Sequence, residues 1–590
     1  MTVYSLMQQL AAGSLRSRNP LRVQFIRVVY HVVGDSECAN LVWYPCREAN
    51  PVQNGQLFLA EDAQGCIRRR LAWGEFATSS RTCVCAPMSS QAITLTMWKL
   101  EMKNKEKFFT TAIMIGWTLY LLLQRGHPND EAEHLHIAWL IQAQNLMPIK
   151  DFFEHHQPAT WHLLGTLFQF GVNEEWLLFF GRVYVAFAVL LSALGLYQIA
   201  RRSQTVGGGY LLLPIYYLML SSLFFNTLLL IRPETFAVPF IVYCVLLWRV
   251  SFLSSRIDAR FLAAAAGMLG MISVMISPRF ALLAPGILLL YPAQMTVTPS
   301  QIVHRVLWGL LGSAAGFLLL LNIFDQTLHE LVFNIKFSAL LQQTGVGYYP
   351  GLPEMLFAGA ASLPLYLICL RHSPYSAQIK RLFFAIFLLV YLISIYFMGK
   401  YFYAQGIFPF LVWVALFIAS TPLQKSEPQH DLLGRTSIAV TVMAAVLCVY
   451  QLSQLGHGNI RRADGQRALL RQVVPAHESV LLPYPIHPIM RLDPGYYSLP
   501  ILEGKNRLCD TIAVFDATPA LPACDYHEAI QLYRPALVAK RFLPVNNENI
   551  DYARFISRNY SYNPDMKILI RKDLKIPDEP DAGQASADDG

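Results

Sequence analysis

Residues 176–199 read WLLFFGRVYVAFAVLLSALGLYQI, a run that is apolar almost throughout. About 20 predominantly apolar residues let a helix cross a bilayer, so this run predicts a transmembrane helix. Similar stretches recur along the chain, at 108–124, 209–230, 234–250, 260–277, 279–295, 305–324, 355–370, 382–398, 403–420 and 436–455. The sequence therefore predicts an all-α polytopic membrane protein with about eleven transmembrane helices.

The composition agrees with a membrane protein. Of 590 residues, 54% are hydrophobic and only 15% are charged, whereas a soluble domain has about a quarter charged. The net charge of +8 raises the question of a nucleic-acid partner. Lys and Arg lie mainly between the apolar stretches rather than on one basic face, so we expect membrane lipids as the partner and no nucleic acid.

The distribution of Lys and Arg also predicts the orientation of the chain. If the residues before 108 are cytoplasmic, the outer loops hold few basic residues: Arg125, Lys150, Arg232, Arg279, Lys336 and Lys400. The inner loops hold many more, as expected for a cytoplasmic N-terminus. An odd number of spans then places the tail after residue 455 outside. Compact loops favour a bacterial inner (plasma) membrane.

The chain divides into four parts. Residues 1–96 contain no apolar span and no signal-peptide core, while 97–107 begin with Met and carry four lysines. We interpret 1–96 as a poorly ordered extension or as sequence that is not normally translated. Residues 97–455 form the predicted membrane domain, 456–575 a small α/β extracytoplasmic domain, and 576–590 a disordered acidic tail.

Two features support the tail domain. The short apolar runs at 479–482 and 567–570 predict strands. Cys509 and Cys524 lie in the same region, and in an oxidising compartment they are a candidate disulfide.

The spacing Cys83-x-Cys85 lacks the His partners of a zinc site, so we assign no metal there.

The predicted first outer loop, 125–175, carries the densest set of ionisable residues. They are Asp130, Glu131, Glu133, His134, His136, Asp151, Glu154, His155 and His156. A hydrated surface loop is one interpretation. The alternative is a site at the membrane surface, because the acidic pair follows the first span by about six residues and 151–158 mixes acids, His and aromatic residues. A carboxylate there could act as a general base.

This loop resembles the first outer loop of GT-C glycosyltransferases. The resemblance rests on Asp130-Glu131 after the first span, an Ala-rich helix, the segment Asp151-Phe-Phe-Glu-His-His-Gln-Pro158, and the topology, over roughly residues 100 to 500. It is nearest to family 39, which includes protein O-mannosyltransferases and lipid A aminoarabinose transferases.

The resemblance implies a donor and a reaction. The donor would be a polyprenyl-phosphate sugar, and the acceptor a lipid, a glycan or a protein. Asp130 would be the general base or would position the acceptor, and Glu131 would orient the substrate or a divalent cation. One base and no covalent intermediate predict inversion. Related transferases often carry Lys-Pro-Pro where this chain has His155-His156-Gln157-Pro158, so a phosphate contact there would pass to a protonated His.

A departing polyprenyl phosphate needs cations. Arg232, Arg279 and Lys400 lie at predicted outer boundaries and would stabilise that charge; the alternative is that each is an interfacial anchor. Arg232 and Glu234 are close enough in sequence to pair with each other. Tyr401 and Tyr403 either line a sugar subsite or belong to an aromatic belt. With Asp151, Glu154, His155 and His156, these residues complete the predicted substrate site.

Two other functions compete with a transferase. A transporter or a flippase for lipid-linked sugars would favour internal repeats and ionisable residues at mid-membrane, whereas the charges here cluster at the outer edge. A non-catalytic scaffold would not need an acidic pair at the interface. The sequence has no Walker-type phosphate loop, which argues against a nucleotide-driven pump.

Overall fold

The structure is a computed structural model, and it describes only part of the chain. The described residues are 129–148, 151–152, 156–203, 209–224, 230–254, 256–292, 297–324, 326–328, 330–332, 352–398, 404–422, 466–467, 470–483, 486–494, 526–543, 550–564 and 566–574. The predictions for 1–96, for the spans at 108–124 and 436–455, and for the acidic tail at 576–590 lie outside these residues.

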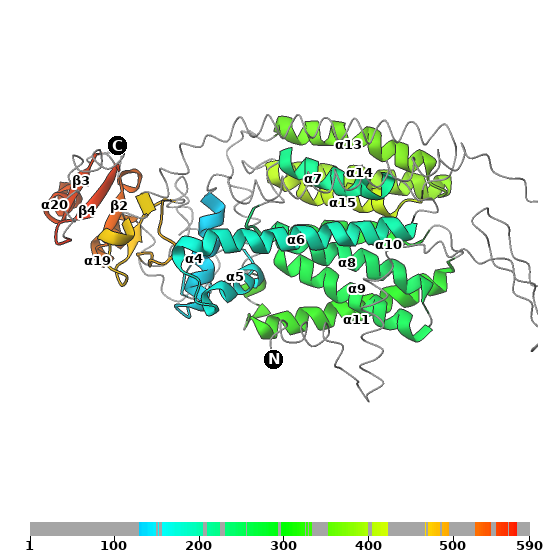
Figure 1. The fold of residues 1–590 in the computed structure, drawn as a ribbon, viewed down its shortest axis with the longest axis horizontal. Coiled ribbons are helices and arrows are strands. Elements are labelled where there is room, and N and C mark those ends of the chain that lie inside the picture. Colours follow the sequence, from blue (N-terminus) through cyan, green and yellow to red (C-terminus); the bar gives the residue numbers. More distant parts are fainter. Residues whose placement is uncertain are drawn as a thin grey trace, which may run out of the picture. The chain divides into compact units, whose positions relative to one another are not determined.

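The described part of the chain before residue 466 is helical. Its elements, labelled as in Figure 1, are α4 (Asn129–Gln142), α5 (Ala159–Gln169), α6 (Glu174–Ser203), η1 (Gly209–Leu212), α7 (Leu213–Phe224), α8 (Pro233–Leu253), α9 (Arg256–Ile276), η2 (Pro278–Leu283), α10 (Ala284–Leu289), α11 (Pro299–Ile323), α13 (Leu352–His372), α14 (Ala377–Met398), η3 (Ala404–Ile407) and α15 (Phe408–Ser420).

Five helices of the described part are long and apolar enough to cross a membrane: α6, α8, α9, α11 and α14. They coincide with the spans predicted at 176–199, 234–250, 260–277, 305–324 and 382–398. Three shorter apolar helical segments lie at Pro278–Leu289, Leu356–His372 and Phe408–Ser420. The chain is therefore an integral membrane protein, and the total of eleven spans stays a prediction.

The long helices begin where the sequence supplies start signals. Arg232 has an extended backbone, and Pro233 follows at the first position of α8, where proline's fixed φ and missing N–H fit a helix start. In α11 the Thr298 hydroxyl accepts from the Gln301 N–H, and the Gln301 side chain accepts from the Thr298 N–H. This capping box satisfies donors that the first helical turn leaves unpaired.

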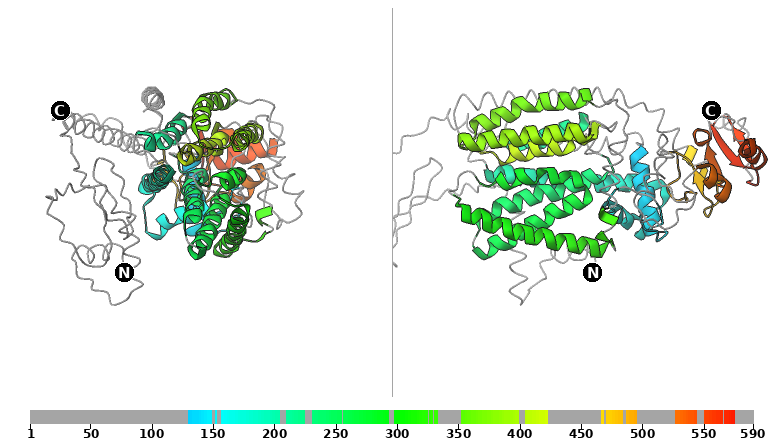
Figure 2. Two further views of the ribbon diagram at one scale, coloured as in Figure 1. Left: turned by 90° about the vertical axis from the view of Figure 1, so that its right-hand side faces the viewer. Right: turned by 180° about the vertical axis from the view of Figure 1, so that it is seen from behind.

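Four long helices pack in series. α6 packs on α8, α8 on α9 and α9 on α11, and the two views of Figure 2 show them running side by side. In the central helix α8, 72% of its most apolar 18-residue stretch is buried, against 17% of the corresponding stretch in α11. The exposed face of α11 carries Leu307, Leu310, Leu311 and Leu318. A bilayer would cover this leucine face.

A second group of helices is centred on α15. All thirteen of its residues are buried, and it packs against α7, α6, α14 and α13. Phe417 stacks on Tyr366 of α13 with ring centroids 4.1 Å apart. A helix that is apolar on all sides needs an apolar environment, which a protein core or a bilayer can provide, and for this short helix the neighbouring helices provide it.

Glycines let α9 and α11 approach closely. A Cβ added at Gly312 would overlap the Ala264 backbone, whereas one added at Gly309 would meet the Ala263 carbonyl at 3.7 Å, an ordinary contact. The Ser313 hydroxyl donates to the Gly267 carbonyl across the same interface, at 3.0 Å. Small residues that allow backbone contact are the usual means of helix association in membranes.

The difference in space for a Cβ predicts that alanine has different effects on stability at Gly312 and Gly309. Gly312→Ala should lower stability by about 1–3 kcal/mol, because the two backbones must move apart. Gly309→Ala should be neutral or slightly stabilising, because the methyl group has room and alanine favours the helix by about 1 kcal/mol. Thermal unfolding of both variants in detergent measures the effect. Equal melting temperatures would contradict close contact at Gly312.

The C-terminal part contains a four-stranded sheet, β1 (Val480–Leu481), β2 (Leu537–Ala539), β3 (Tyr560–Asn563) and β4 (Ile568–Arg571), in the order β1-β2-β4-β3. β1 is parallel to β2, and the other pairs are antiparallel. Its other elements are α19 (Tyr526–Tyr533), η4 (Lys540–Phe542) and α20 (Ile550–Asn559). β1 and β4 lie on the two apolar runs that predict strands, and the outside location of this part stays a prediction.

Candidate functional site

The acidic pair lies in the first turn of α4 rather than in a loop before it. Negative side chains are favourable there, because the first N–H groups of a helix carry partial positive charge. Consecutive helical residues are rotated by about 100°, so the two carboxylates face different surroundings. The side chain of Glu131 is fully buried, whereas that of Asp130 is 29% exposed.

Glu131 is held from two directions. Arg182 of α6 donates to its Oε2 through Nη2 at 2.6 Å and through Nε at 3.1 Å. The Ile231 N–H donates to Oε1 at 3.2 Å. The Arg182 side chain is 4% exposed, so both charges are buried. A charged pair at this depth needs such complete pairing to be tolerated, and it fixes α4 against α6 and the segment before α8.

Asp130 begins a chain of alternating charges. Its Oδ2 lies 2.6 Å from Nη1 of Arg232, and Nε of Arg232 lies 3.5 Å from Oε2 of Glu234. Oε1 of Glu234 in turn accepts from Nη1 of Arg279 at 2.7 Å. Arg232 thus contacts Glu234, as the sequence suggested, and also Asp130. These charged side chains connect three helical elements, α4, α8 and η2.

The two end residues of the charged chain are partly exposed to solvent, and its two middle residues are nearly buried. The Asp130 and Arg279 side chains are 29% and 31% exposed, whereas Arg232 and Glu234 are 11% and 7% exposed. Together with Glu131 and Arg182 the cluster has three carboxylates and three guanidinium groups, so its formal charges balance. One end offers an accessible carboxylate and the other an accessible cation.

Two further rings lie close to His134, which is one turn after Asp130 on α4. Trp161 of α5 donates its indole N–H to Nδ1 of His134 at 3.2 Å. The His156 ring lies 5.7 Å from that of His134, edge-on, and 6.2 Å from that of Trp161. His134 occupies the same face of α4 as Asp130, four residues earlier. The structure therefore brings the predicted residue His156 towards α4.

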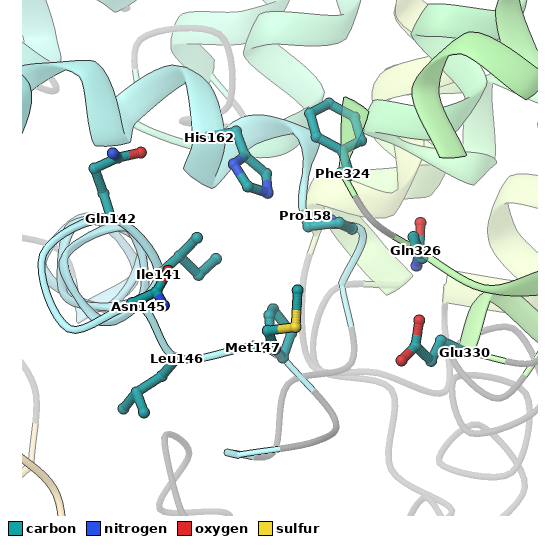
Figure 3. A pocket seen from close by; sticks show the side chains of 11 residues that line it. Ile141, Gln142, Asn145, Leu146, Met147, Pro158, His162, Phe324, Gln326 and Glu330 are labelled. Carbon is teal, nitrogen blue, oxygen red and sulfur yellow. The ribbon is translucent and has the colours of Figure 1, made fainter. Parts of the chain in front are cut away.

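Asp151 has a local role. Its Oδ2 accepts from the Met147 N–H at 2.8 Å, and its own N–H donates to the Met147 carbonyl at 2.8 Å. These bonds close a turn next to a pocket of about 190 Å³ lined by residues of α4 and α5, by the segments at 145–148 and Pro158, and by Phe324, Gln326 and Glu330 (Figure 3). In that pocket His162 stacks on Phe324 at 4.8 Å, and burial lowers the pKa of His162.

The structure thus brings together five predicted site residues: Asp130, Glu131, Arg232, Glu234 and Arg279. The predicted residues Glu154, His155, Lys400, Tyr401, Tyr403, Cys509 and Cys524 lie outside the described residues, and their roles stay predictions. Sequence reasoning missed Arg182. Its signal was present, because it is the single charged residue within the apolar run 176–199, and an ionisable residue within a span implies a specific partner.

Comparison with known proteins gives structural similarity without sequence similarity. No protein-family model matches the chain, and no curated protein sequence matches it. The structure is similar to crystal structures of ArnT from Cupriavidus metallidurans. For ArnT bound to undecaprenyl phosphate the TM-score is 0.43 and the identity 11%, covering 66% of this chain and 84% of that chain. For apo ArnT the values are 0.42 and 12%, covering 66% and 85%. At such identity a likeness concerns the arrangement of helices and carries no information on the reaction.

Proposed function

We propose that the chain is a membrane glycosyltransferase that moves a sugar from a polyprenyl-phosphate carrier to a hydroxyl of a lipid, glycan or protein acceptor. The observation that carries this proposal is the charged chain from Asp130 to Arg279, with its two accessible ends. A sugar hydroxyl is a weak nucleophile, and a carboxylate within hydrogen-bond reach takes its proton as the attack develops. Asp130 is the carboxylate placed for that step.

Arg279 is the group placed for the leaving phosphate. Negative charge grows on the phosphate as the anomeric bond breaks, and a fixed cation in a water-poor setting stabilises that charge. Arg279 keeps its position through Glu234, at 2.7 Å, and remains 31% exposed. In direct displacement the acceptor and the leaving group lie on opposite sides of the anomeric carbon. A base at one end of the charged chain and a cation at the other suit this arrangement, with inversion as the outcome.

The two middle residues of the charged chain, Arg232 and Glu234, would hold Asp130 and Arg279 in place. Arg232 and Glu234 are nearly buried and each contacts charged partners, which limits the movement of the Asp130 and Arg279 side chains. Preorganised charges do not have to reorient during the reaction, which is the main source of electrostatic catalysis. The predicted location of this site at the outer membrane face is part of the proposal.

The test is a transfer assay on the full chain in lipid nanodiscs. The donors are radiolabelled hexoses and pentoses on polyprenyl phosphate, and the acceptors are a lipid A-type glycolipid, an oligosaccharide and a peptide. The proposal expects label to move from at least one donor. No transfer from any donor by folded protein would contradict it, and a lipid-flipping assay would then test the transporter alternative.

With an active donor, Arg279→Gln should lower kcat/KM for that donor about tenfold or more, because a charge-assisted contact with the phosphate contributes about 1.5 kcal/mol. Arg554→Gln is the matched control, since Arg554 of α20 is 66% exposed and pairs only loosely with Asp551 at 3.5 Å. An unchanged kcat/KM for the donor in Arg279→Gln would remove Arg279 from the phosphate site.

A further inference from the structure

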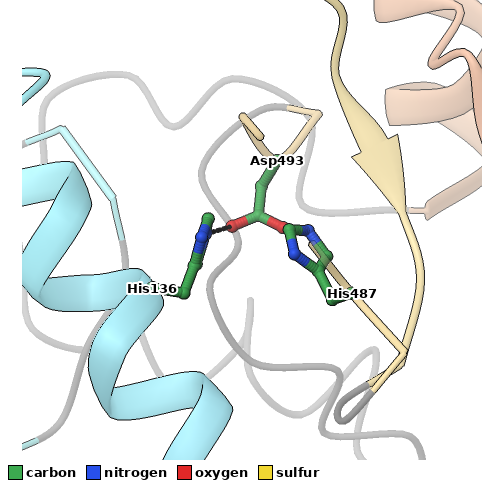
Figure 4. Close-up of side chains that lie close together, drawn as sticks. All are labelled: His136, His487 and Asp493. Atoms are coloured by element: carbon green, nitrogen blue, oxygen red, sulfur yellow. Dashed lines mark hydrogen bonds and ion pairs between the residues drawn. The ribbon is translucent and has the colours of Figure 1, made fainter. Parts of the chain in front are cut away.

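A second cluster of ionisable side chains joins α4 to the segment after β1. His136 of α4 faces Asp493, with Nε2 of the imidazole 2.9 Å from Oδ2 of the carboxylate. His487 faces the other carboxylate oxygen, with Nε2 3.1 Å from Oδ1. The histidine side chains are 0% and 1% exposed, and that of Asp493 is 12% exposed. Figure 4 shows the carboxylate lying between the two imidazole rings.

The other ring nitrogen of each histidine lies against a backbone carbonyl. Nδ1 of His136 is 2.8 Å from the Ile489 oxygen, and Nδ1 of His487 is 2.6 Å from the Pro488 oxygen. A carbonyl oxygen can only accept, so both Nδ1 atoms carry a proton. In the neutral form each imidazole then has its lone pair on Nε2. Both lone pairs would point at the carboxylate of Asp493.

Two lone pairs aimed at a carboxylate repel it, so something positive must lie between them. Either each of the two contacts holds a proton, carried by an imidazole or by the carboxyl group, or a metal ion occupies the position that the three groups share. An ionised carboxylate and two neutral imidazoles would leave a divalent ion with a residual charge of about one unit.

The geometry points to a binding site for a divalent transition-metal ion of the Zn²⁺ class, with Nε2 of His136, Nε2 of His487 and the carboxylate of Asp493 as ligands. The three ligand atoms lie within 4.8 Å of one another. Two His and one carboxylate are a common zinc ligand set, with bond lengths of about 2.0–2.2 Å and room for a fourth ligand. Each His that binds a metal usually donates its other N–H to a carbonyl or carboxylate, as both do here.

The surroundings indicate what such an ion would do. Ile489 lies in the hydrophobic core of the helices, and its N–H donates to Oε1 of Glu174 at the start of α6, at 2.8 Å. The segment 486–494 is thus already docked on the helices by apolar and polar contacts. A metal ion would fasten it to His136, about 7.5 Å along α4 from Glu131. We assign the ion a positioning role, because it would fix the helix that carries Asp130.

Metal content tests the site without any activity assay. The full chain is purified through a tag that contains no histidine, treated with a chelator, and reloaded with Zn²⁺ or Co²⁺. The inference expects about one ion per chain, the visible absorption of Co²⁺ in a tetrahedral site, and a melting temperature that Zn²⁺ restores and Mg²⁺ does not. Wild-type protein that takes up neither Zn²⁺ nor Co²⁺ would overturn the inference and favour doubly protonated histidines.

Three variants locate the ion. His487→Gln and Asp493→Asn should each weaken Co²⁺ binding at least about tenfold, since each removes one ligand. His477→Gln is the matched control, because His477 lies in the same C-terminal part and is 81% exposed, so it should bind like wild type. Undiminished Co²⁺ binding in the two ligand variants would also overturn the inference. The chelation and reloading of wild type keep the test decisive if either variant fails to fold.

Discussion

Asp130→Asn is expected to lower the rate of sugar transfer about a hundredfold or more, because the amide has the size of the carboxylate but cannot accept the acceptor's proton. The effect should lie in kcat, since the donor site around Arg279 is untouched. The fold should persist. The Asp130 side chain is 29% exposed, its amide replacement can still accept a hydrogen bond from Arg232, and Arg232 keeps its contact with Glu234, so the cost should stay below the about 3–5 kcal/mol of a broken buried pair. The measurement is transfer from the active donor under saturating conditions.

The matched control is Asp551→Asn, because Asp551 is an acidic residue in the first turn of α20 with a side chain 90% exposed. It should leave transfer unchanged. Melting temperature and size-exclusion profile of Asp130→Asn must match wild type for the comparison to hold. A folded Asp130→Asn protein with transfer within about threefold of wild type would show that Asp130 is not the base.

The membrane helices were largely predictable from sequence, because a span needs only length and apolar composition. The predicted span at 234–250 corresponds to α8 at Pro233–Leu253. The apolar run at 279–295 is different. In the structure it begins as η2 and continues as the six-residue α10. Pro278, Pro285 and Pro292 punctuate it, and hydropathy alone does not register the breaks that proline introduces.

The site was predictable in its residue types but not in its pairings. Acids on the first outer loop and arginines at outer boundaries could be recognised one at a time. Sequence could suggest that Arg232 pairs with Glu234, because they are two residues apart. It could not show that Arg232 also reaches Asp130, about a hundred residues earlier in the chain. Such contacts depend on how α4 docks against α8, which local patterns do not encode.

The same limit applied to His136. It was visible as one of several histidines in an ionisable loop, but its partners lie more than 350 residues later, at Ile489 and Asp493. Nothing in the spacing of His487 and Asp493 points back to α4, because metal-ligand motifs are recognisable only when the ligands are close in sequence. A long-range cluster of this kind becomes apparent only when the fold brings the segments together.

The pair of Glu131 and Arg182 should dominate the stability of α4. Arg182→Met removes the cation and leaves a fully buried carboxylate with the Ile231 N–H as its described partner. Breaking one side of a buried ion pair costs about 3–5 kcal/mol. Glu131→Gln should cost a similar amount, because it leaves Arg182 buried without its anion. Both single variants are therefore expected to melt well below wild type, measured by thermal unfolding in detergent.

The double variant separates charge from packing. Glu131→Gln combined with Arg182→Met removes both charges and keeps comparable side-chain volume, so it should recover most of the lost stability, as neutral replacements of buried ion pairs often do. The exposed pair of Asp551 and Arg554 is the control, because Arg554→Met should cost less than about 0.5 kcal/mol. If the double variant were as unstable as the sum of the two single variants, the charges would be acting independently, and Glu131 would owe its burial to something other than Arg182. Recovery of stability without loss of transfer would in addition separate Glu131 from the reaction and leave Asp130 as the acid of the pair that acts on substrate.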